Sequence, residues 1–113
     1  MDLGLREDRA GSYVVVEVRG EVDMQTAPEL RERLAGLVDG GQREVIVDLE
    51  RLSFIDSTGL GALVAGRNHA HGADSTLKVV CAAGRVLRLF HITGLHEVFD
   101  IYPTLPEAVA SHA

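Results

Sequence analysis

Residues 43–66 read REVIVDLERLSFIDSTGLGALVAG, and this segment decides the fold. Its first part, residues 43–49, has the continuous apolar centre of a strand that lies centrally in a sheet. Residues 53–56 then bridge to a helix predicted over residues 57–66. Three glycines each lower the helix propensity of that stretch by about 1 kcal/mol relative to alanine, so we expect close packing of helix on sheet in compensation. A strand that leads into a helix is typical of an α/β protein.

Strand and helix patterns alternate along the rest of the chain. Because strands that alternate with helices form right-handed crossovers, the pattern predicts an α/β class with a mixed, largely parallel sheet of four to five strands. We expect one domain over residues 1–113, since the chain is too short for two. The predicted strands cover residues 12–20, 43–49, 76–81 and 98–102, and residues 3–9 are a candidate partner for the first. The predicted helices begin near Thr26, Ser57, Arg85 and Thr104.

The helix that follows the first strand has recognisable start and stop signals. Thr26 can cap its amino end, Pro28 is tolerated in the first turn, and Glu29 completes a capping box. Gly40 and Gly41 can end it, because glycine accepts left-handed backbone angles.

Composition and charge limit the classes of function. The net charge of −6 and the lack of a basic cluster argue against nucleic acid as a partner. The amino-terminal residues are charged where a signal peptide would be apolar, and no apolar run is long enough to span a bilayer, so we expect a cytoplasmic protein. Cys81 is the single cysteine and lies in an apolar run, where a buried thiol without a functional role is the usual interpretation.

Two loops that follow predicted strands have unusual chemistry, residues 20–23 and residues 54–59. Ser57 falls at or next to a helix N-cap, where free N–H groups and the helix dipole would stabilise a phosphate. The simpler interpretation is that Ser57 only caps the helix and that Asp56 is an ordinary turn residue. Residues on either side of these two decide between the interpretations.

Residues 55–61, Ile-Asp-Ser-Thr-Gly-Leu-Gly, resemble the signature of STAS domains of the anti-sigma factor antagonist family. Residues 20–23, Gly-Glu-Val-Asp, followed by Thr26, Ala27 and a leucine-spaced helix, resemble the other motif of that family at the right distance upstream. The order of elements agrees as well, so the resemblance covers nearly the whole chain.

The resemblance implies a switch without catalysis by this chain. Ser57 would be the phosphorylation site, with Thr58 as a second choice. The implied partner is an anti-sigma factor that is also an ATP-using serine kinase. The unphosphorylated antagonist would bind it and free a sigma factor, phosphorylation would end the complex, and a metal-dependent serine phosphatase would reset it. ATP and metal would belong to these partners, and this chain would need no cofactor. The residues expected at the partner surface are Asp23, Thr26, Asp56, Ser57, Thr58 and Gly59.

Three alternatives remain at this point. A serine hydrolase would use Ser57 in a nucleophile elbow, but Ile55 stands where that turn needs glycine and no histidine has the context of a triad base. His69 and His71 suggest a metal site, although no carboxylate or cysteine cluster joins them. The more serious alternative is another non-enzymatic role of the same domain, as a scaffold or as a regulatory subunit of a signalling or transporter complex.

Overall fold

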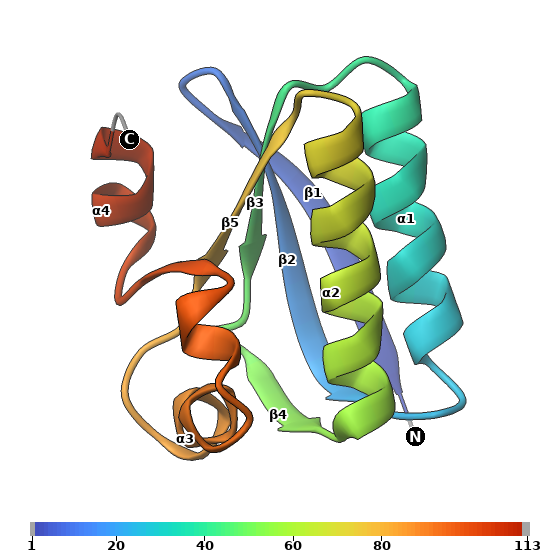
Figure 1. Ribbon diagram of the computed structural model, residues 1–113, viewed down its shortest axis with the longest axis vertical. Coiled ribbons are helices and arrows are strands. Elements are labelled where there is room, and N and C mark those ends of the chain that lie inside the picture. The colour runs from blue at the N-terminus through green and yellow to red at the C-terminus, as the bar shows by residue number, and fades with distance from the viewer. Residues whose placement is uncertain (1, 112–113) are drawn as a thin grey trace.

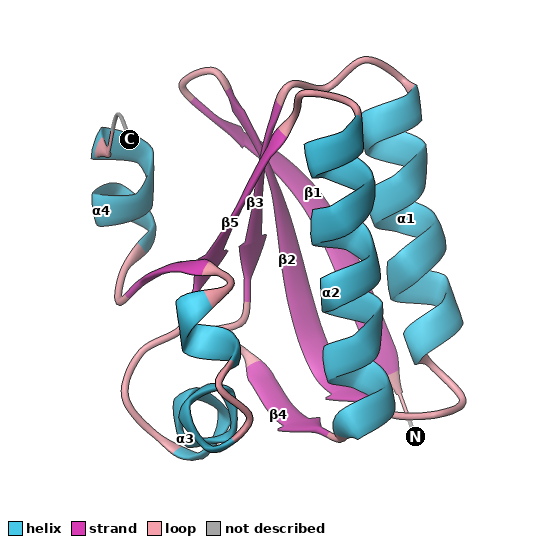
Figure 2. Ribbon diagram, viewed as in Figure 1, coloured by secondary structure: helices cyan, strands magenta, loops and turns pink. Residues whose placement is uncertain are grey.

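The computed structural model describes residues 2–111 as an α/β domain built on one mixed sheet (Figures 1 and 2). The strand order is β1-β2-β3-β5-β6, and β4 pairs separately with β2. Only the β1/β2 pair is antiparallel among the five pairings, so the predicted α/β class and the pairing of residues 3–9 are confirmed. The strands are β1 (Leu3–Ala10), β2 (Tyr13–Val22), β3 (Glu44–Asp48), β4 (Leu52–Ile55), β5 (Thr76–Val80) and β6 (Asp100–Tyr102).

The prediction of four to five strands was wrong, because the sheet formed by residues 2–111 has six. The additional strand is β4, which lies where the sequence predicts a bridge into the helix. It forms because β2 is longer than β3. The first half of β2 pairs with β3, and its last three residues pair with β4, with a shift in register between Gly20 and Glu21. Burial alternates little along β4, where only Leu52 and Ile55 are buried, so its sequence carries a weak strand pattern.

The helices are α1 (Ala27–Asp39), α2 (Ser57–Gly72), α3 (Arg85–Ile92) and α4 (Leu105–Ala110), with a 3₁₀ turn, η1, at Leu95–Glu97. The helix predicted over residues 57–66 therefore extends six residues further. The last strand is shorter than predicted, because the N–H groups of Val98 and Phe99 both donate to the carbonyl of Leu95 and continue the turn of η1.

One face of the sheet, which we call the front face, is covered by α1 and α2 lying side by side (Figure 1). Val16, Val18 and Val47 point to this face, and each is completely buried. Leu34 of α1 and Leu63 of α2 pack into the same cluster. Most of the buried apolar side chains belong to this front-face core.

The glycines of α2 show how closely the helix packs. A Cβ atom on Gly59 would lie 2.6 Å from a side-chain carbon of Ile55 and 2.7 Å from the carbonyl oxygen of Val22. A Cβ atom on Gly66 would lie 2.7 Å from Leu34. The expected packing of helix on sheet is thus confirmed at Gly59, whereas Gly66 allows contact with α1. A Cβ atom on Gly61 would meet nothing within 4 Å, so packing does not explain why this position is a glycine.

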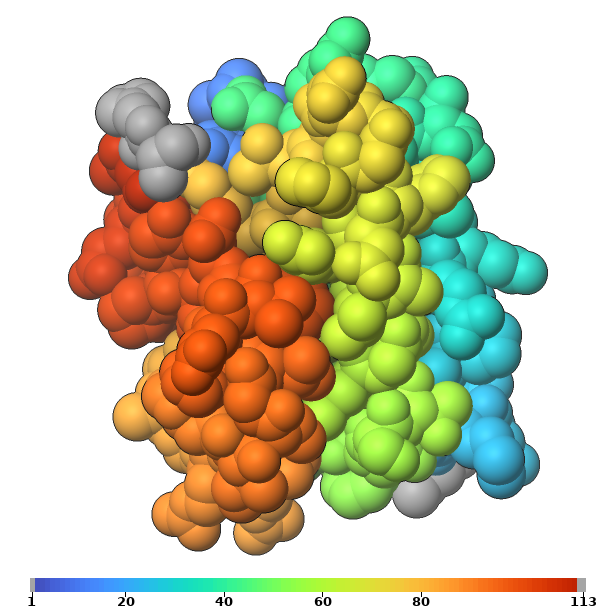
Figure 3. Space-filling model, viewed as in Figure 1, coloured from blue at the N-terminus to red at the C-terminus, as the bar shows by residue number. Residues whose placement is uncertain are grey.

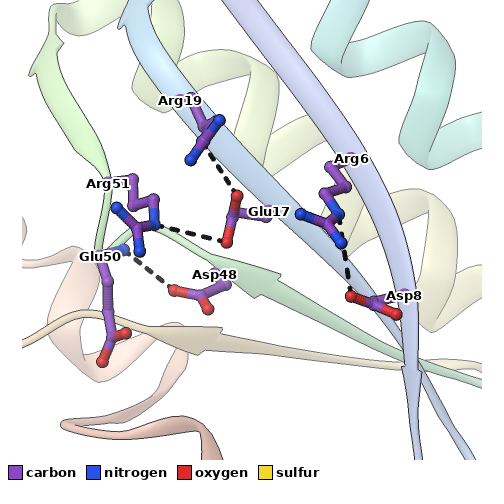
Figure 4. A network of polar contacts seen from close by, with 7 residues as sticks. All are labelled: Arg6, Asp8, Glu17, Arg19, Asp48, Glu50 and Arg51. Atoms are coloured by element: carbon purple, nitrogen blue, oxygen red, sulfur yellow. Dashed lines mark hydrogen bonds and ion pairs between the residues drawn. The ribbon is translucent and has the colours of Figure 1, made fainter.

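The opposite face of the sheet, the back face, is only partly covered. Tyr13, Val15, Ile46 and Val80 form a small apolar cluster there with Ala108 of α4. Further along the same strands the back face is charged. Arg19 and Arg51 both pair with Glu17, at 3.1 and 3.7 Å (Figure 4).

Candidate functional site

The two chemically unusual loops lie next to each other at the carboxyl ends of β2 and β4. These strands are parallel, and Val22 is in register with Ile55. The N–H of Asp56 also donates to the carbonyl of Val22 at 3.2 Å. Asp23 and Asp56 each come one residue after a member of this pair. The register therefore brings together the two loops that the sequence singled out.

Asp56, and not Ser57, is the cap of α2. Its Oδ1 accepts a hydrogen bond from the N–H of Gly59 at 2.9 Å, and its backbone is extended, as is usual for an N-cap residue. Ser57 is the first residue of the helix and is exposed, like Thr58. Ser57 forms no side-chain hydrogen bond with any of residues 2–111. Because Asp56 does the capping, the hydroxyl of Ser57 is available at the amino end of a 16-residue helix.

The predicted capping box of α1 was wrong. Thr26 occupies the N-cap position, but its side chain makes no capping hydrogen bond. Its hydroxyl donates instead to the carbonyl of Glu21 at 2.8 Å and accepts from the N–H of Asp23 at 2.9 Å. Thr26 therefore ties the start of α1 back to β2, because a nearby backbone carbonyl competes for its hydroxyl.

Asp23 organises the loop that leads into α1. Its Oδ1 accepts hydrogen bonds from the N–H groups of Gln25 at 2.9 Å and Thr26 at 3.1 Å. The hydrogen bond from the Thr26 N–H is the main cause that lowers the pKa of Asp23, and the Gln25 N–H adds to it. Asp23 is therefore a carboxylate with a fixed position beside the α2 cap.

Gly59 is buried, so it contributes to the candidate surface only indirectly. The absence of a side chain allows the first turn of α2 to approach Val22 and Ile55. The position of Ser57 therefore depends on a glycine two residues further along the helix.

Sequence reasoning missed two exposed apolar side chains that flank the site. Met24 follows Asp23 and is 73% exposed, and Phe54 of β4 is 40% exposed. Phe54 also lines a groove of about 360 Å³ with Val86 and Leu89 of α3. The space-filling view shows the surfaces of α2 and of the α3–η1 segment meeting along one face of the molecule (Figure 3). The signal available in the sequence was that a large apolar residue directly follows one motif loop and another begins the second.

Among the described histidines, none forms a hydrogen bond with Ser57. His69 and His71 are in the last turn of α2, and twelve residues of helix place His69 roughly 18 Å from Ser57. The Nε2 of His69 lies 2.6 Å from a carboxylate oxygen of Asp39, within hydrogen-bond distance, and the rings of His91 and His96 pack on each other. His112 lies outside the described residues. The hydrolase alternative therefore gains no base from the four histidines that the structure describes.

Cys81 is buried, and burial raises the pKa of its thiol to about 11, as expected for an unreactive cysteine. Residues 2–111 contain no group of three or more His, Cys, Asp or Glu side chains that could hold a metal ion. In the same part of the chain, no helix has the length and apolarity needed to cross a membrane.

Fold and site together define a class of protein, namely a small α/β domain that presents a serine at a helix start beside a second, acidic loop. The STAS domain model matches residues 6–108, and the chain belongs to the STAS domain family. A curated relative named anti-sigma-B factor antagonist, from Staphylococcus aureus, is 36% identical over 101 residues, which are 89% of this chain and 94% of that protein.

Solved structures agree with this assignment. An anti-sigma factor antagonist from Mycobacterium paratuberculosis superposes with a TM-score of 0.87 at 30% identity, covering 96% of this chain and 92% of the other. The Bacillus cell fate determinant SpoIIAA, in its phosphorylated form, has a TM-score of 0.71 at 21% identity over 94% of this chain and 96% of its own, and it shares the fold.

Proposed function

We propose that this chain is an anti-sigma factor antagonist whose surface around Ser57 binds an anti-sigma factor, and that phosphorylation of Ser57 ends the binding. The observation that carries the proposal is the exposed serine at the start of α2, held next to Asp23 by the pairing of Val22 with Ile55. Proteins named as antagonists of this kind resemble the chain over nearly its whole length.

The local chemistry favours a charge switch. A phosphoserine adds about −1.5 to −2 charges, and the amino end of a helix stabilises such a group within the monomer. Asp56 is its neighbour in sequence, and Asp23 follows the strand that pairs with β4. A partner that approaches an uncharged hydroxyl would meet three acidic groups after phosphorylation. Burying an unpaired charge costs several kcal/mol, which is enough to lower the affinity by orders of magnitude.

The surroundings of Ser57 support a protein as the partner. Met24, which follows Asp23, and Phe54 of β4 offer exposed apolar contact area, and aromatic and methionine side chains are enriched in protein interfaces. Thr26 and Gly59 stabilise the two loops of this surface, Thr26 by its hydrogen bond to the carbonyl of Glu21 and Gly59 by allowing α2 to approach the sheet. Thr58 is exposed beside Ser57 and serves as a contact residue.

The proposal assigns the chemistry to the partners. The anti-sigma factor would be a serine kinase that supplies ATP, and a metal-dependent serine phosphatase would restore the free hydroxyl. This chain would act by binding alone, and we expect it to do so in the cytoplasm, where sigma factors work.

The proposal is tested by incubating the protein with ATP and a purified candidate kinase, chosen from the genes that neighbour its own. Mass spectrometry should find one phosphate, on Ser57. Ser57→Ala should take up no phosphate and keep its affinity for the kinase, whereas Ser57→Asp should weaken binding at least about tenfold. Thr58→Ala is the matched control and should still be phosphorylated. A phosphate on another residue with Ser57 unmodified would exclude the assignment and favour a scaffold role.

The proposed role of Asp23 in binding the partner can be separated from its role in stabilising the loop. Asp23→Asn keeps an oxygen that can accept the hydrogen bonds from Gln25 and Thr26, but removes the charge. We expect Asp23→Asn to melt close to the unmodified protein and to bind the kinase more weakly. Asp23→Ala should lose both stability and binding. Equal binding by Asp23→Asn and the unmodified protein would limit Asp23 to its structural role.

A further inference from the structure

Lys78 is an unusual residue of the sheet, because it is a charged side chain in the middle of β5 that is only 1% exposed. Its neighbours Leu77 and Val79 point to the front-face core, so Lys78 lies on the back face beneath α4. The ammonium group donates to the hydroxyl of Tyr13 at 2.6 Å, to the carbonyl of Ala108 at 3.1 Å and to the carbonyl of Ser111 at 2.8 Å. All three of its N–H donors are therefore used.

Two of the three acceptors are carbonyls at the carboxyl end of α4, one of Ala108 within the helix and one of its C-cap residue Ser111. The last carbonyls of a helix have no partner within the helix and carry partial negative charge, which favours a cation. The ammonium also lies 4.8 and 5.3 Å from the ring centres of Tyr13 and Tyr102, within the range of cation–π attraction. The hydroxyl of Tyr102 donates in turn to the side chain of Ser111 at 2.8 Å.

Lys78 and α4 stabilise each other. Among residues 2–111 no carboxylate forms an ion pair with Lys78, so neutral oxygens and aromatic rings replace the water around its charge. A helix of six residues is too short to persist alone in water. If α4 leaves the sheet, Lys78 loses two hydrogen bonds and becomes hydrated, while α4 loses its support.

We propose that Lys78 is a latch that holds residues 103–111 on the back face, and that this segment opens as a unit while the remainder of the domain stays folded. Opening uncovers the apolar cluster of Tyr13, Val15, Ile46 and Val80. The front-face core contains no residue of α4, so nothing in that core has to move. The latch is independent of the switch proposed at Ser57.

Hydrogen exchange followed by NMR on the full chain tests the opening. The N–H groups of Ala108 and Ser111 are hydrogen-bonded within the α4 segment, and those of β3 report on global unfolding. We expect the α4 amides to exchange at least about tenfold faster than the β3 amides, with a rate that depends little on low concentrations of urea. Equal opening free energies and equal urea dependence in the two regions would overturn local opening.

Lys78→Met tests the latch itself, because methionine has a similar length without the donors or the charge. We expect the α4 amides to exchange about tenfold faster again, since two hydrogen bonds are lost, with the β3 amides changed less. Unchanged or slower exchange in α4 would overturn the latch. Tyr13→Phe is the control, because it removes the acceptor that lies outside α4 and should affect α4 less. Lys78→Gln, which keeps a donor without the charge, serves if Lys78→Met does not fold.

Discussion

The two faces of the sheet differ in the interactions that cover and stabilise them. On the front face α1 and α2 cover the strands, and Leu30, Leu34 and Leu63 are at most 1% exposed. The back face has one six-residue helix and, beyond it, ion pairs around Glu17 (Figure 4). The candidate site lies at the ends of elements that pack in the front-face core. The larger of the two cores therefore stabilises its geometry. The difference suggests that Ser57 is supported by the more tightly packed face of the domain.

The largest expected effect comes from deleting core volume on the front face. Leu63→Ala should lower the free energy of unfolding by about 2–5 kcal/mol, because a buried leucine leaves a cavity when it is truncated. Leu105→Ala, on the partly buried side of α4, should cost about 1 kcal/mol or less. Urea unfolding followed by circular dichroism measures both. Equal losses would remove the contrast between the faces.

A smaller effect is expected from a methyl group added to α2. Gly59→Ala should destabilise the protein by about 1–3 kcal/mol, since the new carbon would overlap atoms of Val22 and Ile55. Gly61→Ala is the matched control on the same helix. It meets nothing within 4 Å and should gain up to about 1 kcal/mol from helix propensity. Thermal melting of both variants measures the two changes in stability. A stabilised Gly59→Ala would mean that α2 does not rely on this close approach.

The smallest effect is expected on the back face, at Asp48. Burial raises the pKa of Asp48, and the nearby Glu17 carboxylate adds to the shift, although the N–H of Glu50 opposes it with a 3.0 Å hydrogen bond. A carboxyl whose pKa is higher in the folded state favours folding while protonated, and this contribution is lost as the pH rises through its folded pKa.

Asp48→Asn removes that ionisation and keeps an oxygen for the Glu50 N–H. Its stability relative to the unmodified protein should therefore grow as the pH is raised from about 3 to 7. Urea unfolding at several pH values gives the difference. A constant difference over this range would show that Asp48 is solvated well enough to ionise without cost.

Much of the fold could be predicted from the sequence because its signals are local. The apolar run of β3, the glycine stop after α1 and the alternation of strands with helices each depend on neighbouring residues. β4 could not be recognised, because it exists only where the end of β2 extends past β3. The strand β6 was predicted too long, because the N–H groups of Val98 and Phe99 are hydrogen-bonded in the turn of η1.

The candidate site could be predicted as two loops but not as an arrangement. Which of Asp56 and Ser57 caps α2 depends on backbone angles that neither residue type fixes. In the predicted capping box the hydroxyl of Thr26 accepts a hydrogen bond from the start of α1, whereas in the structure it donates to the carbonyl of Glu21, a contact that depends on how the end of β2 leads into α1. The flanking side chains of Met24 and Phe54 are apolar, and their exposure depends on the tertiary fold.

The outer strand β1 has a consequence for how copies of this protein meet. Its residues from Arg6 to Arg9 are charged and exposed, with both signs represented, and Arg6 pairs with Asp8 on the same side of the strand. An unpaired strand edge can template the addition of another chain, and charged side chains along it oppose that stacking. The charges of β1 therefore oppose the pairing of this edge with the same edge of another copy.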